Sequence, residues 1–182
     1  MIIEKELCTS APTLESERLL MRAHQPSDFE LSCEMWAHPD VVRYISGKPS
    51  SRSDTWGRLL KYAGHWSLLG FGYWAVIDKE TNTLVGDVGF ADFKRQITPS
   101  LQGFAEAGWV LSPKFHGRGY GREAVELALK WFKEAKLFSE AHCIIAPENT
   151  ASMALAQRVG FEEYTQGYYN GEPTVFLKQK MS

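Results

Sequence analysis

Short apolar runs separated by turn residues dominate the middle of the chain, and this pattern predicts an antiparallel sheet. Strands are predicted over residues 73–78 and 83–91, with the polar segment 79–82 turning between them, and over residues 103–111. The polar segment 92–102 contains a proline and is predicted to be a loop. The middle of the chain would therefore form a meander.

Further strands are predicted on both sides of the meander. A first strand covers residues 18–24, and a buried strand covers residues 141–146. Two last strands flank Asn170-Gly171, a dipeptide typical of tight hairpin turns.

Helical periodicity predicts four helices. Ser27 and Glu30 have capping-box spacing at the start of the first one. The second begins after the serine-rich residues 50–53, and its inward stripe would consist of Trp56, Leu59, Leu60 and Ala63. A third helix follows the glycine-rich segment and runs to about residue 136. Asn149 can cap a fourth helix that Gly160 ends.

Composition and charge indicate one globular domain over residues 1–182. The chain is 44% hydrophobic, which is ample for a core. It carries 20 Lys and Arg against 22 Asp and Glu, so no basic field is available to bind nucleic acid. Residues 1–8 lack the pattern of a secretory leader, and no apolar run approaches the ~20 residues of a membrane span. We therefore expect a cytoplasmic protein without a membrane partner.

The cysteines and histidines predict neither a disulfide framework nor a metal site. The odd set of three cysteines, expected to be reduced and structural, consists of Cys8, Cys33 and Cys143. The five histidines have no metal-ligand spacing.

The most informative motif is a run of alternate glycines at the start of the third predicted helix. It reads His116-Gly117-Arg118-Gly119-Tyr120-Gly121-Arg122. Glycines keep side chains away from the free N–H groups of a helix start, which makes a cradle for phosphate. Arg118 and Arg122 could add positive charge to its rim. The alternatives are a flexible turn with capping glycines and an arginine-glycine segment that binds RNA, the latter disfavoured by the net charge.

The order of elements and motifs from residue 104 onward resembles the GCN5-related N-acetyltransferase (GNAT) family. The matching segments are residues 106–113, 116–124 and 147–161, which include Glu-Asn-Thr-Ala-Ser and Val-Gly-Phe. The resemblance extends to residues 84–89 and 17–19, and it is closest to the branch that contains ribosomal-protein N-terminal acetyltransferases.

This resemblance implies an α/β fold with a mixed, mostly antiparallel sheet of six to seven strands. Helices would cover both faces, and the sheet would be splayed between its fourth and fifth strands. The donor would be acetyl-CoA or another acyl-CoA, with its pyrophosphate on the N–H groups of residues 117–122. Its pantetheine arm would bind backbone groups of Val110 and Leu111, as an added strand would. Asn149 and Ser152 would also contact the donor.

Two positions depart from the family pattern. His116 stands where Gln or Arg usually opens the glycine loop, and we interpret it as structural. Ala156 stands where many members have the tyrosine that protonates the leaving thiolate.

Glu106 and Ser152 are the predicted catalytic residues. Glu106 would accept a proton from the amine, directly or through water; the alternative is a solvent-facing strand residue. Ser152 lies one helical turn before Ala156 and would be the acid; the alternative is a hydrogen bond to backbone or donor. An acceptor pocket or, alternatively, core packing is predicted for Trp36, His38, Trp66, Phe71, Trp74 and Phe93.

The sequence thus predicts an acyl-CoA-dependent N-acetyltransferase acting on a primary amine by direct transfer. The acceptor would be a small molecule or a protein N-terminus. The alternative is a domain that binds acyl-CoA as a sensor without transfer. Dimers are common among proteins of this kind, so a homodimer is also considered.

Overall fold

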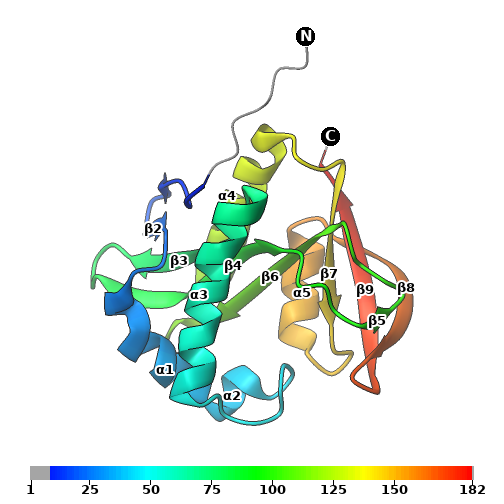
Figure 1. Cartoon of the computed structure of the whole chain (residues 1–182), viewed down its shortest axis with the longest axis horizontal. Helices are drawn as coiled ribbons and strands as arrows, with labels where there is room; N and C mark the ends of the chain where they lie inside the picture. Colours follow the sequence, from blue (N-terminus) through cyan, green and yellow to red (C-terminus); the bar gives the residue numbers. More distant parts are fainter. Residues whose placement is uncertain (1–8, 182) are drawn as a thin grey trace.

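A computed structural model describes residues 9–181 of the 182-residue chain, and one mixed nine-stranded sheet runs through them (Figure 1). The strand order is β1-β2-β3-β4-β6-β7-β9-β8-β5. Within this part of the chain, every strand pairing is antiparallel except that of β6 with β7. Cys33 and Cys143 are free thiols. Cys8 lies outside the described residues.

The strands are β1 (Leu14–Glu15), β2 (Leu19–Arg22), β3 (Tyr73–Asp78), β4 (Thr83–Ala91), β5 (Ile97–Thr98), β6 (Ala105–Leu111), β7 (Glu140–Ile145), β8 (Glu162–Tyr169) and β9 (Glu172–Lys180). The α-helices are α1 (Phe29–Ala37), α2 (Pro39–Val42), α3 (Arg52–Leu69), α4 (Tyr120–Ala135) and α5 (Thr150–Arg158). Short 3₁₀ turns cover η1 (Pro26–Asp28) and η2 (Pro113–Phe115). None of these helices combines the length and apolarity that a membrane crossing requires.

The predicted fold class is confirmed, but the predicted strand count is too low. The seven predicted strands are present; the additional two are β1 and β5, each of two residues. Two residues are too few to show a period, so neither is visible in the sequence pattern. Because β5 pairs with Tyr168 and Tyr169 of β8, part of the predicted loop 92–102 belongs to the sheet.

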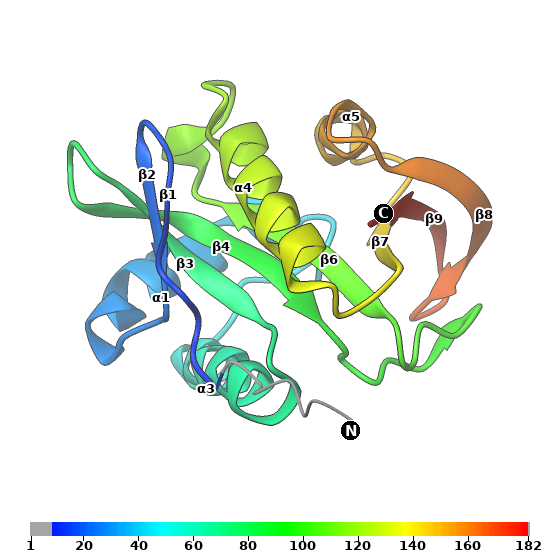
Figure 2. The same ribbon diagram turned by 90° about the horizontal axis from the view of Figure 1, so that it is seen from above.

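Helices cover both faces of the sheet, as predicted. In Figure 2, α1 and α3 lie on one side of the sheet, toward the bottom of the picture, and α4 and α5 lie on the other side, toward the top. The largest core cluster contains the buried side of α4, including Ala124, Ala128 and Phe132. Phe132 stacks on Phe90 of β4 with ring centroids 4.0 Å apart. This packing holds α4 against the sheet.

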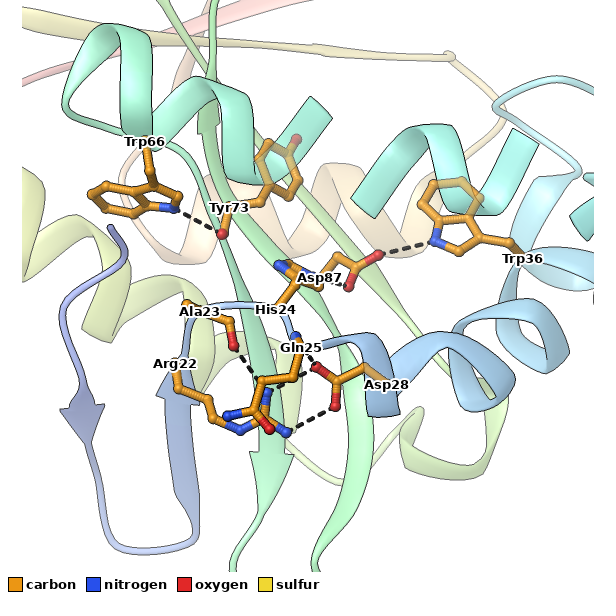
Figure 3. Close-up of polar contacts among 9 residues, drawn as sticks. All are labelled: Arg22, Ala23, His24, Gln25, Asp28, Trp36, Trp66, Tyr73 and Asp87. Atoms are coloured by element: carbon orange, nitrogen blue, oxygen red, sulfur yellow. Dashed lines mark hydrogen bonds and ion pairs between the residues drawn. The ribbon is translucent and has the colours of Figure 1, made fainter. Parts of the chain in front are cut away.

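The start of α1 differs from the prediction. Pro26 opens the turn η1, and the Asp28 carboxylate accepts a hydrogen bond from the Gln25 N–H at 2.7 Å (Figure 3). Ser27 lies inside this turn, and Glu30 pairs with Arg52 instead. The Ser27–Glu30 capping box is therefore wrong, because the proline moves the helix entry toward the N-terminus.

Helix α3 exists as predicted, but most of the predicted stripe faces outward. Trp56 and Leu60 are 40% and 55% exposed. The buried side contains Leu59 and, in addition, Thr55, Tyr62, His65 and Trp66. A search for apolar periodicity overlooks this side because three of these residues have polar groups.

The sheet opens between β6 and β7. Their parallel pairing is limited to Ala105 with Ala141 and Glu106 with His142. In the described structure, β6 therefore has a free edge from Ala107 to Leu111. The predicted splay between the fourth and fifth predicted strands is confirmed.

Candidate active site

Two left-handed glycines precede α4. Gly117 has a φ of 70° and Gly119 a φ of 81°, a conformation that glycine adopts without the strain of a Cβ atom. A Cβ at Gly117 would meet nothing within 4 Å, and one at Gly119 would meet the Arg18 guanidinium at 3.4 Å. The space in front of this backbone is open to a ligand.

The start of α4 presents backbone donors to that space. The first intrahelical hydrogen bond runs from the Glu123 N–H to the Gly119 carbonyl, at 3.1 Å. The N–H groups of residues 120–122 therefore have no partner within the helix, and the helix dipole adds partial positive charge there. Such a helix start binds phosphate, so the geometry fits the predicted cradle over residues 117–122.

The side chains around the cradle differ in their roles. Arg122 pairs with Glu126, with Nε 2.7 Å from Oε1, so its charge is partly neutralised. The Tyr120 side chain is buried and donates its hydroxyl hydrogen to Asp78 at 3.0 Å, so it can serve a ligand only through its backbone. Arg118 lies over the Tyr120 ring and, within the described part of the chain, forms no ion pair.

Arg18 is a cation at the cradle that the sequence analysis misses. Its Nη1 donates to the Arg118 carbonyl at 2.9 Å, and its Nη2 lies 2.7 Å from the Glu123 carboxylate. Burial alone would raise the pKa of Glu123, but hydrogen bonds from Ser16 and Arg18 outweigh burial and lower it. Arg18 precedes β2 and lies 100 residues before Arg118, so no local motif connects it to the cradle.

Backbone alternation along β6 decides which residues face the splay. The Ser112 N–H donates to a β4 carbonyl at 2.8 Å, and a Cβ on Gly86 of β4 would come within 2.0 Å of the Val110 carbonyl oxygen. Alternate residues of an antiparallel strand bond to the same neighbour, so Trp109 and Leu111 direct their backbone groups to the open side. This corrects the prediction for Val110, whose polar backbone groups face β4. In this part of β6, the backbone groups of Trp109 and Leu111 face the splay.

The cradle and the open edge of β6 adjoin each other. His116 Nε2 lies 2.9 Å from the Leu111 carbonyl oxygen and must carry the hydrogen, since a carbonyl accepts. A Cβ on Gly121 would lie 3.5 Å from the Leu111 side chain. The start of α4 and the open edge of β6 are therefore neighbours.

Helix α5 borders the splay from the other side. The Asn149 side-chain carbonyl accepts a hydrogen bond from the Ser152 N–H at 3.2 Å, which caps the helix as predicted. Trp109 Nε1 donates to Ser152 Oγ at 3.3 Å, so the serine hydroxyl keeps its own hydrogen for a further partner. Ala156 is fully buried.

Glu106 is buried, with 6% of its surface exposed, so the solvent-facing alternative is wrong. Arg95 binds its carboxylate with two nitrogens at 3.0 Å and donates to the Tyr169 hydroxyl at 2.8 Å. Burial alone would lower the pKa of Arg95, but the charge of Glu106 and its hydrogen bonds raise it. Both oxygens of the Glu106 carboxylate are therefore occupied by the Arg95 guanidinium.

Asp87 on β4 is a second buried carboxylate that the sequence analysis does not single out. Its Oδ1 lies 2.8 Å from His24 Nε2, and its Oδ2 accepts a hydrogen bond from Trp36 Nε1 at 2.9 Å (Figure 3). The sequence feature that points to Asp87 is a carboxylate inside the mostly apolar strand 83–91. Four residues predicted for either pocket or core are core residues, namely Trp36, Trp66, Phe71 and Trp74.

The side chains at the splay do not form a metal centre. Within residues 9–181, no three His, Cys, Asp or Glu side chains are grouped as metal ligands. The site therefore offers backbone donors, a buried carboxylate with its cation, and a serine hydroxyl around one open strand edge.

Known proteins are similar to this chain in sequence and in fold. The model of the family described as an acetyltransferase (GNAT) domain matches residues 18–162. The uncharacterised N-acetyltransferase p20 of Bacillus licheniformis is 26% identical over 152 residues, which are 83% of this chain and 83% of that protein.

Two solved structures show the same fold. An acetyltransferase from Agrobacterium tumefaciens is 26% identical with a TM-score of 0.80, covering 97% of this chain and 98% of that chain. RimL, an alpha-N-protein acetyltransferase of a ribosomal protein solved in complex with coenzyme A, is 14% identical with a TM-score of 0.75. That match covers 93% of this chain and 98% of the RimL chain. The predicted resemblance is confirmed.

Proposed function

The chain belongs to the GNAT acetyltransferase family, and from this premise we propose that it transfers an acetyl group from acetyl-CoA to a primary amine. The observation that carries the proposal is that the start of α4 adjoins the open edge of β6. The start of α4 suits a pyrophosphate, and the strand edge suits an extended amide chain; coenzyme A carries these two groups in the same order.

The donor would bind mainly through backbone groups. Its pyrophosphate would accept hydrogen bonds from the N–H groups of residues 117–122, with Arg18 and Arg118 at the rim. Its pantetheine arm would pair with Trp109 and Leu111 as an added strand. The free side-chain nitrogen of Asn149 is a further donor to it, because its carbonyl is used as the helix cap.

The reaction would proceed by direct attack of the amine on the thioester. The amine nitrogen forms a bond to the acetyl carbon, the carbon–sulfur bond breaks, and the ammonium proton must leave. Glu106 would accept this proton through water, and the hydroxyl of Ser152 would protonate the departing thiolate. An N–H at the open edge of β6 would stabilise the oxyanion.

Both oxygens of Glu106 already accept hydrogen bonds from Arg95, which leaves little room for a further donor and favours an acceptor that loses its proton easily. An α-amino group has a pKa of about 8 and a lysine-like amine a pKa of about 10.4. An α-amine therefore releases its proton closer to neutral pH and demands less of a carboxylate whose two oxygens are already engaged, whether that amine is on a small molecule or on a protein N-terminus. RimL, which acts on an α-amine, has the same fold. We further propose that the protein acts in the cytoplasm as a homodimer.

The test is calorimetric titration of acetyl-CoA into the protein, with NAD as the comparison ligand, followed by thiol release with a panel of amines. We expect one-site binding selective for acetyl-CoA and amine-dependent thiol release. Donor binding without thiol release would support the sensor alternative. A folded protein that binds no acetyl-CoA at millimolar concentration would contradict the proposal.

A further inference from the structure

Arg58 on α3 is a cation without a carboxylate. Its guanidinium carbon lies 3.5 Å from the centroid of the Trp36 ring, and its Nε is buried without a hydrogen-bond partner. None of the ion pairs in the described part of the chain includes Arg58. In contrast, Arg22, Arg52 and Arg95 each pair with a carboxylate.

Two aromatic contacts connect Arg58 to the open half of β6. Trp36, on which its guanidinium lies, belongs to a cluster that packs against Val110. Tyr62, one helical turn after Arg58, stacks on Tyr73 with ring centroids 4.6 Å apart. The Tyr73 hydroxyl lies against β6, where a Cβ on Gly108 would come within 1.9 Å of it. Arg58 therefore lies one aromatic layer from the strand that would hold the thioester.

The charge of Arg58 acts on these aromatic residues. Burial raises the pKa of Tyr62 and Tyr73, and in both the positive charge of Arg58 works in the opposite direction.

The nearby carboxylates are already engaged. Asp87 is held by His24 and Trp36, Glu106 by Arg95, and Asp92 by Lys94. Asp54, one helical turn before Arg58, is exposed and accepts a hydrogen bond from Ser51. Asp87 keeps its negative charge, because the indole of Trp36 is neutral. Arg58, whose Nε has no hydrogen-bond partner, is therefore the cation of the α3 wall that can still bind an anion.

We propose that the acceptor carries a carboxylate close to its amine, and that Arg58 binds this carboxylate while the amine reaches the thioester at β6. This inference rests on the proposed function and names its substrate class. A guanidinium whose face is covered by Trp36 and whose Nε is buried keeps the edge formed by its two terminal nitrogens, which matches the two oxygens of a carboxylate. An amino acid and a peptide with an acidic N-terminal residue share this chemistry.

The experiment compares acceptors that differ by one carboxylate. The amino acid arm uses alanine and alaninamide, and the peptide arm uses Asp-Ala-Ala-amide and Asn-Ala-Ala-amide, with spermidine as a cationic acceptor. We expect kcat/KM to favour the carboxylate member of at least one pair by about 10- to 100-fold, the range of a hydrogen-bonded charge pair. The pair that shows this preference identifies the source of the acceptor.

The Arg58→Gln variant should reduce that preference to less than about twofold, mainly through KM. Arg58→Lys should recover part of it, since the charge returns without the planar edge. Arg52→Gln, the same change on the same helix, is the matched control and should leave the preference intact. Equal kcat/KM for both members of each pair, preference for spermidine, or a preference that persists in Arg58→Gln would overturn the proposal.

A binding arm separates failure of this inference from failure of the proposed function. The four carboxylate and amide probes are titrated into the protein saturated with CoA, and into the protein alone if CoA does not bind. Tighter binding of a carboxylate probe that is lost in Arg58→Gln supports the inference even without thiol release. Equal binding within both pairs overturns it even if acetylation of amines is observed.

Discussion

At the residue scale, Glu106 and Arg95 act as one unit rather than as separate side chains. Replacing Glu106 with Gln leaves a largely buried guanidinium without its carboxylate. We expect the free energy of unfolding to fall by about 2–3 kcal/mol, measured by urea denaturation. Glu30→Gln breaks the exposed pair with Arg52 and should change stability little.

The same Glu106→Gln variant tests the proposed base. Turnover should fall more than donor affinity, and most strongly at pH values below the pKa of the acceptor amine, because a neutral amide cannot accept the proton. A pH profile of kcat together with calorimetric donor binding measures both effects. Full turnover across the profile would exclude Glu106 as the base.

Gly119 provides the corresponding test of the phosphate cradle. Gly119→Asp places a side chain and a negative charge at the backbone donors, so we expect acetyl-CoA to bind at least about tenfold more weakly in calorimetry. Gly171→Asp is the matched control, since Gly171 has the same φ of 81° and free space around its Cβ position. Equal donor affinity of the two folded variants would exclude the cradle.

The local structures that the sequence predicts correctly around the candidate site are those with local signals, namely the glycine loop as the entry to α4 and Asn149 as the cap of α5. The glycine loop and the Asn149 cap each act within a few positions along the chain. Arg18, Arg95 and Asp87 have no such signal, since their partners are brought together by the sheet. The pairing of Glu106 with Arg95 could not be predicted from the sequence either, because Arg95 lies 11 positions earlier in the predicted loop.

At the element scale, α5 joins stability to the site through its cap. Asn149→Ala removes the acceptor for the Ser152 N–H, so we expect a loss of about 1 kcal/mol in the free energy of unfolding. Asn149→Ser should restore most of that stability. Weaker acetyl-CoA binding in both variants would indicate a donor contact by the amide, whereas recovery of donor affinity in Asn149→Ser would assign Asn149 to capping alone.

The positions of strands and helices could be predicted where a segment was long enough to show a repeating pattern of apolar residues. The hairpin of β3 and β4 has the predicted bounds, since polar residues mark its turn. The inward side of α3 was not predictable, because it contains Thr55, His65 and Tyr62, whose polar groups hide them from a count of apolar residues. The pairing of β5 with β8 depends on residues about 70 positions apart, and two residues show no pattern.

At the scale of the whole molecule, His142 couples stability to pH. It lies on β7 between the Tyr164 hydroxyl and the Glu140 carboxylate, which also pairs with Lys178. Burial lowers the pKa of His142 below its usual 6.5, although Glu140 partly opposes this. The unfolded chain therefore takes up the proton first as the pH falls.

We expect the free energy of unfolding to decrease as the pH falls below about 6.5, through the folded-state pKa of His142, before the carboxylates titrate. This contribution is fully present above pH 6.5. Urea denaturation between pH 5 and 8 measures it, and His142→Gln should show a flatter profile over that range. An identical slope in both proteins would contradict the assignment to His142.

The two residue pairs that join β6 to β7 leave a strand edge in the middle of the sheet. An amide at such an edge exchanges its hydrogen with water faster than an amide bonded within a sheet. In the protein alone, the amides of Trp109 and Leu111 should take up deuterium quickly, while that of Val110 between them stays slow. A bound pantetheine arm should slow the outer two and leave Val110 unchanged, so deuterium exchange at three successive residues reports donor occupancy without any acceptor.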